Sequence, residues 1–166
     1  LNYCTPPKGR ILVVNITHEI EHHHHLLRKE EGFRAYYKDS DKRIVTINIQ
    51  QTDYRSVEKY VAAALANTDN IKAIFVTNSR VSTVARYLEK RGKKDMLLIG
   101  YDFIKENIAN LQKGLIDFLI CQKPQEQGYK CIMALYHNVI QPTPVEKISF
   151  MSIDIITKEN YAFYKN

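Results

Sequence analysis

The sequence predicts an α/β fold in which a mostly parallel sheet lies between two layers of helices, a three-layer sandwich. Short runs rich in β-branched residues alternate with longer segments whose apolar residues recur at helical spacing. The first run, RILVVNI at 10–16, is almost entirely apolar, as expected of a strand buried on both faces. With 166 residues, 45% hydrophobic and 25% charged, the chain can form a buried core.

Each element is expected from its own pattern. Strands are expected at 10–16, 43–49, 72–78, 96–102 and 116–124, with a last strand pair within 148–157. Helices are expected at about 19–38, 54–67, 81–92, 104–114 and 125–140. Asp53 is expected to cap the second helix and Gly92 to end the third, and a polar cap is expected where the fourth begins near Ile104.

Several common functions are excluded by composition and motif. No glycines form GxGxxG or GxxxxGK, so the usual dinucleotide and phosphate loops are absent and no cofactor is expected. The net charge is +6, but Lys and Arg are spread over the whole length, which disfavours a nucleic-acid surface. No run approaches the roughly 18 to 20 apolar residues that span a bilayer, so no membrane partner is expected.

The cysteines give a weak indication of compartment. Cys4, Cys121 and Cys131 cannot all pair with one another, and none lies in a CxxC or metal-binding spacing. We expect them to be small buried thiols in a reducing compartment. Neither Cys121 nor Asp102 has a histidine partner at a predictable distance, so an enzyme is not expected.

Polar residues follow the expected strands at their carboxyl ends, where open parallel sheets bind ligands. They are Asn15 to His18, Asn48 to Gln51, Asn78, Ser79, Asp102 and Gln122. Amides and a carboxylate present paired donors and acceptors, which suit the vicinal hydroxyls of a sugar or polyol. Alternatively, these residues only form the turns at the strand ends.

At these residues the sequence resembles the effector-binding domain of the LacI/GalR transcription regulators, which shares its fold with periplasmic sugar-binding proteins. The resemblance lies in the order of four segments: IKAIFVTNS, DMLLIGYD, LQKGLIDFLICQKPQEQGY and IDIITKENY. RILVVNI and the helix that ends EEGFRAYY extend it over nearly the whole chain.

The resemblance implies roles for individual residues. Asn78 looks like the family residue that hydrogen-bonds sugar hydroxyls, Asp102 like the aspartate that accepts from them, and Gln122 lies where the chain crosses a hinge. Two departures stand out. Asn78-Ser79 replaces the usual Asn-Asp, and Lys29 stands where an arginine is usual, with Arg28 one place early; a lysine cannot make the same two-pronged contact.

The stretch EIEHHHHLLRKEEGF at 19–33 is expected to open the first helix. Helical spacing is interpreted as placing one set of side chains on the ligand side: His18, His22, His25 and Lys29. Another set is expected to point elsewhere: Leu26, Phe33 and Tyr37. We therefore expect His25, and with it His22, to face the ligand. Metal binding by the histidines and an exposed helix start without a role are the alternatives.

The resemblance also predicts that part of a two-lobed protein is missing. Residues 1–122 would form the second lobe, and 123–166 a hinge-crossing helix and strands that belong partly to the first lobe. The chain begins with Leu1 rather than methionine, so it is expected to be an excised piece. Faces left uncovered would favour a homodimer.

The favoured interpretation is a cytoplasmic transcription regulator fragment that senses a small-molecule effector, and this effector is expected to be a sugar. It would contact DNA only through an N-terminal helix-turn-helix that this chain lacks. Ligand closure of the two lobes would alter operator binding. The alternative is an extracytoplasmic sugar-binding protein of a transporter, or a receptor's sensor domain.

Overall fold

The computed structural model describes residues 9–18, 24–38, 43–92, 95–140 and 146–164. Within these ranges the strands are β1 (Arg10–Ile16), β2 (Ile44–Ile49), β3 (Ile71–Val76), β4 (Leu97–Tyr101), β5 (Phe118–Cys121) and β6 (Asp154–Ile156). The α-helices are α1 (His24–Tyr36), α2 (Tyr54–Asn67), α3 (Val81–Lys90), α4 (Lys105–Gln112) and α5 (Pro124–Ile140). A short 3-10 helix, η2 (Tyr161–Phe163), follows β6.

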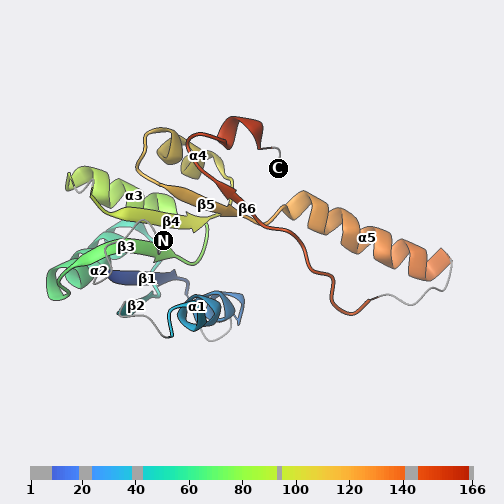
Figure 1. Ribbon diagram of the computed structural model, residues 1–166, viewed down its shortest axis with the longest axis horizontal. Coiled ribbons are helices and arrows are strands. Elements are labelled where there is room, and N and C mark those ends of the chain that lie inside the picture. The colour runs from blue at the N-terminus through green and yellow to red at the C-terminus, as the bar shows by residue number, and fades with distance from the viewer. Residues whose placement is uncertain (1–8, 19–23, 39–42, 93–94, 141–145, 165–166) are drawn as a thin grey trace.

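The six strands form one sheet in the order β2-β1-β3-β4-β5-β6 (Figure 1). β1 to β5 pair in parallel, and β6 pairs antiparallel to β5, with Leu119 opposite Ile156. The strand order reverses between β1 and β3, which leads the chain outward in both directions from the centre of the sheet. Such a switch point is where open α/β sheets bind ligands, beyond the carboxyl ends of the strands.

Alternate residues of β1 enter two different cores. Leu12, Val14 and Ile16 pack with residues of α2, α3 and α4 on one face of the sheet. Val13 and Ile11 point to the other face, where α1 packs. The predicted three-layer α/β sandwich with a mostly parallel sheet is therefore confirmed.

The α1 side of the sheet is covered less completely than the other side. α2, α3 and α4 contribute buried residues to the larger core, whereas α1 is the one described helix that packs on the opposite face. Phe33 of α1 stacks on Phe75 of β3 with ring centroids 4.8 Å apart. The parts of β4, β5 and β6 beyond α1 line an open groove, described below.

α5 and the segment that returns from it form an arm, residues 124–140 and 146–153, that extends away from the sheet (Figure 1). No residue of α5 is buried. Its exposed apolar side chains include Tyr129, Ile132, Tyr136 and Ile140, which recur at helical spacing. An apolar stripe of this kind normally packs against another element, and the described part of the chain supplies none for it.

Two expected caps are confirmed. The side chain of Asp53 accepts a hydrogen bond from the backbone N–H of Ser56 at 3.0 Å, at the start of α2. Gly92 follows α3 with φ +63, a left-handed conformation that glycine adopts without steric cost.

Three expectations were wrong. The N-cap of α4 is Ile104, which makes no side-chain cap hydrogen bond, so the expected polar cap is absent. Within 148–157 only β6 is a strand, because residues 148–153 lie on the arm without a strand partner in the described ranges. Cys121 is buried, but Cys131 is exposed because it lies on α5.

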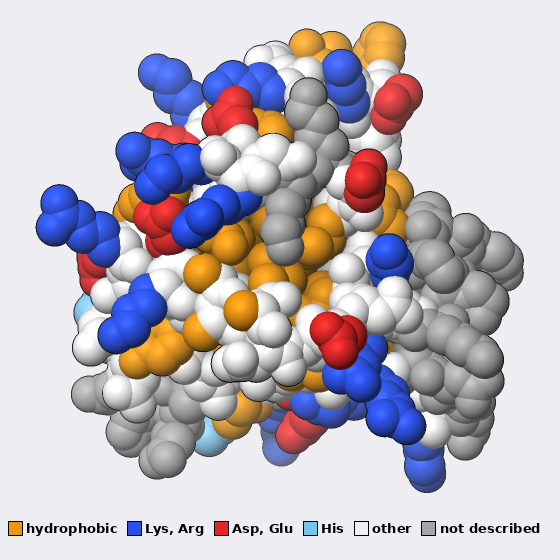
Figure 2. Space-filling view, turned by 90° about the vertical axis from the view of Figure 1, so that its left-hand side faces the viewer, with side chains coloured by type: hydrophobic (Ala, Val, Ile, Leu, Met, Phe, Trp, Pro, Cys, Tyr) orange, Lys and Arg blue, Asp and Glu red, His pale blue; other side chains and the backbone are white. Residues whose placement is uncertain are grey.

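No helix in the described ranges is long and apolar enough to cross a membrane. Charged side chains of both signs are interspersed over the face that Figure 2 shows, with apolar side chains between them. A continuous basic surface does not appear on that face.

Candidate functional site

The carboxyl ends of β3, β4 and β5 bring three predicted site residues to one edge of the sheet. Asn78 follows β3, Asp102 follows β4, and Gln122 follows β5. Because these strands are parallel neighbours, the three side chains come from adjacent positions along that edge. Each is only partly buried, so each remains accessible to a ligand.

Asp102 is held in an uncommon conformation. Its φ is +71, in the left-handed region that aspartate tolerates better than most residues. Its backbone N–H donates to the carbonyl oxygen of Ile120 at 3.0 Å. Its Oδ1 accepts from Nε2 of Gln122 at 3.2 Å, so these two predicted site residues are in direct contact. The carboxylate is thereby aimed along the edge, with further acceptor capacity left on its two oxygens.

Asn78 has both a structural role and spare hydrogen-bonding capacity. Its Nδ2 donates to the carbonyl oxygen of Ile16 at 2.6 Å, and its Oδ1 accepts from the backbone N–H of Arg80 at 3.1 Å. A primary amide has two N–H groups and two acceptor lone pairs. One donor and one lone pair therefore remain for a ligand, and the side chain is already oriented.

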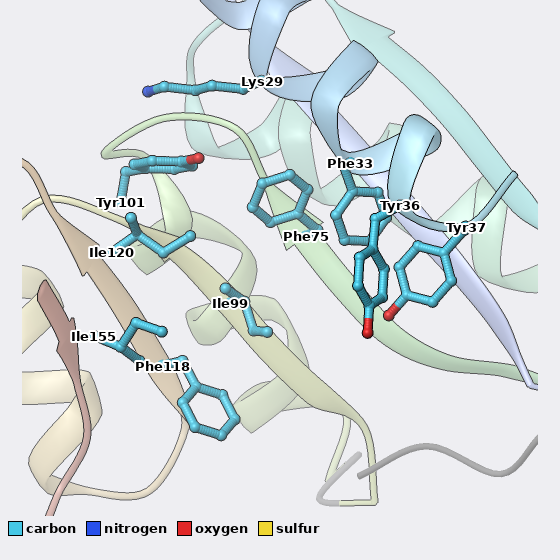
Figure 3. Close-up of a pocket in the computed structure, with 10 residues that line it drawn as sticks. All are labelled: Lys29, Phe33, Tyr36, Tyr37, Phe75, Ile99, Tyr101, Phe118, Ile120 and Ile155. Atoms are coloured by element: carbon cyan, nitrogen blue, oxygen red, sulfur yellow. The ribbon is translucent and has the colours of Figure 1, made fainter. Parts of the chain in front are cut away.

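Lys29 reaches the same edge from α1. Its Nζ donates to the carbonyl oxygen of Thr77 at 3.2 Å and lies 3.6 Å from the ring centroid of Tyr101 (Figure 3). Burial lowers the pKa of Lys29, and the nearby Asp102 carboxylate opposes this by raising it. The pKa of Tyr101 is raised to about 12, first by burial and second by Asp102. The phenol is therefore neutral, and its ring face attracts the ammonium group.

The helical phase predicted for α1 was partly wrong. Lys29, Phe33 and Tyr37 all line one groove on the sheet side of the helix (Figure 3). Their spacing of four residues places them on one face, so Phe33 and Tyr37 do not point away from Lys29. Leu26 is also buried. The site side and the core side of α1 are thus the same side.

The other basic residues predicted to face the ligand either are exposed or lie outside the residues that the structure describes. His25 and Arg28 are exposed on the first turns of α1. His22 belongs to the residues that the structure does not describe. In the described ranges no group of three His, Cys, Asp or Glu side chains is placed to hold a metal ion.

A buried polar network lies directly beneath the edge. Asn15, 1% exposed, accepts from Oγ1 of Thr77 at 2.7 Å and donates to both Glu30 and Asn48 at 2.9 Å. Burial tends to raise the pKa of Glu30, but hydrogen bonds from Thr46, Asn15 and Arg34 outweigh it, and the pKa is lowered. The network ties α1 to β1 and β2, and so fixes where Lys29 can reach.

An aromatic groove of about 380 Å³ opens on the α1 side of the sheet (Figure 3). Lys29 and Tyr101 stand at one end of it. The remaining lining is apolar or phenolic: Phe33, Tyr36, Tyr37, Phe75, Ile99, Phe118, Ile120 and Ile155. Such a lining has few groups that could orient a polyhydroxylated ligand, so the polar edge is the better candidate for the site.

Sequence reasoning missed three residues of this region. Thr77 and Glu30 join the network through hydrogen bonds to residues that are distant in the sequence, so no local sequence pattern predicts them. Asn107 of α4 is fully buried. A signal was available for Thr77 alone, since it directly precedes Asn78 at a strand end.

The fold and this edge define a class: a ligand-binding α/β lobe whose candidate site lies at the carboxyl ends of parallel strands. A family model described as periplasmic binding protein domain matches residues 1–141. The chain belongs to this family.

Solved structures agree with this assignment. The chain is 27% identical to a candidate LacI transcriptional regulator from Bacteroides fragilis, with a TM-score of 0.76, covering 95% of this chain and 56% of that one. A periplasmic ribose ABC transporter protein from Conexibacter woesei gives a TM-score of 0.83 at 15% identity, covering 96% and 54%. An ABC transporter solute-binding protein from Agrobacterium vitis, bound with α-D-tagatopyranose, gives 0.77 at 21%, covering 96% and 53%. The chain thus spans little more than half the length of these proteins.

Among curated proteins, the chain is 29% identical over 118 residues to the chaperone SurA of Buchnera aphidicola. That likeness covers 64% of this chain and 26% of the chaperone. The match covers too little of the chaperone to support a functional conclusion.

Proposed function

We propose that this chain is the second lobe of a sugar-binding effector domain, and that it belongs to a transcription regulator of the LacI/GalR type. The observation that carries the proposal is the juxtaposition of Asn78, Asp102 and Gln122 at one sheet edge, with Lys29 beside them. The similarity to a candidate LacI regulator and to proteins named for ribose and tagatopyranose supports both the class and the ligand chemistry.

The hydrogen-bonding groups at the edge suit a neutral polyol. Asp102 supplies acceptors for sugar hydroxyls, Asn78 supplies one donor and one acceptor, and Lys29 supplies donors. The ammonium of Lys29 and the carboxylate of Asp102 lie near enough to influence the lysine pKa, so their charges offset one another. A ligand with a net charge would disturb that balance.

The basic residues on the first turns of α1 form an outer part of the proposed site. In this proposal His25 and Arg28 line the mouth of the cleft rather than its floor, and His22 stays a proposed ligand residue. Exposure of His25 and Arg28 is compatible with contact to a ligand held between two lobes.

The arm supports the proposed division of the chain. Residues 1–122 would form the second lobe and 123–166 the hinge-crossing segment, whose apolar stripe would pack against the first lobe. A ligand held between the lobes would favour their closed arrangement, and DNA binding through an upstream helix-turn-helix would respond to that shift. No catalytic step is assigned to any residue.

The exposed surface supports association with further protein. The chain exposes 10987 Å², whereas a compact monomer of 19.4 kDa exposes about 8,500 Å². The excess exceeds the roughly 800 Å² that each partner buries in a standard interface. In the proposed regulator a homodimer and the missing lobe would cover this surface.

A transporter's binding protein or a receptor's sensor domain is the second candidate, and the first of these is supported by similar structures that are named as ABC transporter proteins. The free thiols Cys121 and Cys131 are more typical of a reducing compartment and support a cytoplasmic regulator. Sequencing the gene upstream of Leu1 separates the two. A helix-turn-helix there supports the regulator, and a signal peptide supports the transporter.

The site itself is tested by calorimetry on the full-length parent protein. D-ribose, D-arabinose and D-tagatose serve as probes, and Asn78→Ala and Asp102→Ala are compared with wild type. Each variant should weaken binding by about tenfold or more, the loss expected when a buried ligand hydroxyl is left without its partner. Arg55→Ala, an exposed change on α2, is the control. Unchanged affinity in both site variants would refute the assignment.

A further inference from the structure

Asn107 is a buried amide that joins the two loops of the candidate site. It lies in the first turn of α4 and is 0% exposed. Its Nδ2 lies within hydrogen-bonding distance of three backbone carbonyl oxygens, those of Ser79 at 3.0 Å, Tyr101 at 3.0 Å and Asp102 at 3.1 Å, so its two N–H groups are shared among the three. The first carbonyl belongs to the loop after β3, the second to the last residue of β4, and the third to the loop that follows β4.

The amide can have only one orientation. All three neighbours are carbonyl oxygens, so the NH2 group must face them, because the amide oxygen would repel them. The Oδ1 atom, on the other side, is buried and has no hydrogen-bond partner among the described residues. A buried unpaired acceptor costs free energy. In the described part of the chain, the hydrogen bonds of this side chain are therefore made by its NH2 group alone.

The contact with Asp102 falls at one of the three non-glycine residues that have a positive φ in the described ranges. A non-glycine residue at φ +71 is held only by its surroundings. Three groups hold Asp102: the carbonyl of Ile120 binds its N–H, Gln122 binds its carboxylate, and Asn107 binds its carbonyl. Of the three, only Asn107 also binds the loop that carries Asn78 and Ser79.

We propose that Asn107 is a positioning residue that sets the separation of the Asn78 and Asp102 loops, and so determines which pair of ligand hydroxyls the site accepts. The loops and their contacts are observed; the role toward a ligand rests on the proposed sugar-binding function. Asn107 itself does not contact the ligand.

The test begins without a ligand, by amide hydrogen exchange on the 166-residue chain with Asn107→Ala. The reporters are the N–H of Tyr101, which donates to Asn78, and the N–H of Asp102, which donates to Ile120. Both should exchange roughly three- to tenfold faster, the effect of losing one net hydrogen bond, while amides of central β1 stay unchanged. Asn110→Ala is the matched control, because Asn110 is on the same helix and its Nδ2 binds only the carbonyl of Glu106.

A uniform increase over the whole chain, or no increase at the two reporters, would overturn the proposal. If Asn107→Ala does not fold, Asn107→Ser replaces it. The serine hydroxyl can donate to one carbonyl but cannot bridge both loops, so the local increase should persist.

The second readout is sugar affinity in the full-length parent, with the same three sugars. Asn107→Ala should weaken binding by about tenfold in the wild-type background but by less than about twofold when Asp102→Ala is already present. Equal losses in both backgrounds would show that Asn107 does not act through Asp102. If the wild-type protein binds none of the three sugars while amide exchange still rises locally in Asn107→Ala, that result would refute the sugar-binding function but not the role of Asn107 in joining the two loops.

Discussion

At Gly100 of β4, a single added methyl group should perturb the packing that supports the site. A Cβ added there would lie 2.3 Å from Cβ of Val81 and within 2.7 Å of both its methyl groups. Ordinary contact begins at 3.4 Å, so α3 and β4 would have to separate by about 1 Å. Val81 begins α3 directly after the loop that carries Asn78, so the same movement would displace the site.

The magnitude follows from the contact. Overpacking a well-packed core costs about 1–3 kcal/mol, and the upper end applies because the clash includes the Cβ of Val81, which no rotamer change can move. For a chain of this size each kcal/mol lowers Tm by about 2–4 °C, so Gly100→Ala should lower Tm by about 6–12 °C. Circular dichroism during heating measures it.

Gly32 supplies the control. It lies inside α1, and an added Cβ would meet nothing within 4 Å. Gly32→Ala should therefore raise stability by about 0.5–1 kcal/mol, because alanine loses less backbone entropy in a helix. A Tm for Gly100→Ala that equals wild type or exceeds it would refute the packing argument for this interface.

Three further predictions concern the network and the arm. Asn15→Ala removes one hydrogen-bond partner from the hydroxyl of Thr77 and one from the carboxylate of Glu30. The free energy of unfolding, measured with urea, should fall by about 1–3 kcal/mol. An unchanged urea midpoint would contradict this. Because the folded-state pKa of Glu30 is lowered, its stabilisation is present above the ordinary glutamate pKa and is lost as pH falls through the folded value. Glu30→Gln should therefore flatten the acid limb of a stability-versus-pH curve, and an identical limb would count against it. Ile132→Glu on the arm should shift a dimer toward monomer in light scattering, whereas a wild-type chain that is already monomeric at high concentration would exclude the dimer.

Local patterns predicted the sheet and most helix boundaries because they act within a few residues. The apolar run of β1, the cap at Asp53 and the turn at Gly92 each need only neighbouring residues to form. Asn78, Asp102 and Gln122 were predicted at strand ends for the same reason, and parallel pairing then brings strand ends to one edge. Their contact with a ligand stays a prediction.

The remaining features depend on contacts between distant segments. The side of α1 that meets the sheet is set by contacts such as the stack of Phe33 on Phe75 of β3, and the helical phase predicted from sequence wrongly placed Lys29 on a different side from Phe33. Asn107 binds loops that end other strands, so its burial could not be anticipated from α4 alone. The last strand pair was wrong because residues 148–153 have no strand beside them in the described chain.

Sugar binding at the carboxyl edge of the sheet can be measured by the chemical shifts of the backbone amides there. The isotope-labelled 166-residue chain is titrated with D-ribose, D-arabinose and D-tagatose into the tens of millimolar, a range in which a single lobe's weak binding is still visible. Saturable shifts are expected at the backbone amides of Asn78, Asp102 and Gln122, and they should disappear in Asp102→Ala. Shifts confined to the aromatic groove around Phe33 and Phe118, or none with any of the three sugars, would contradict sugar binding at this edge.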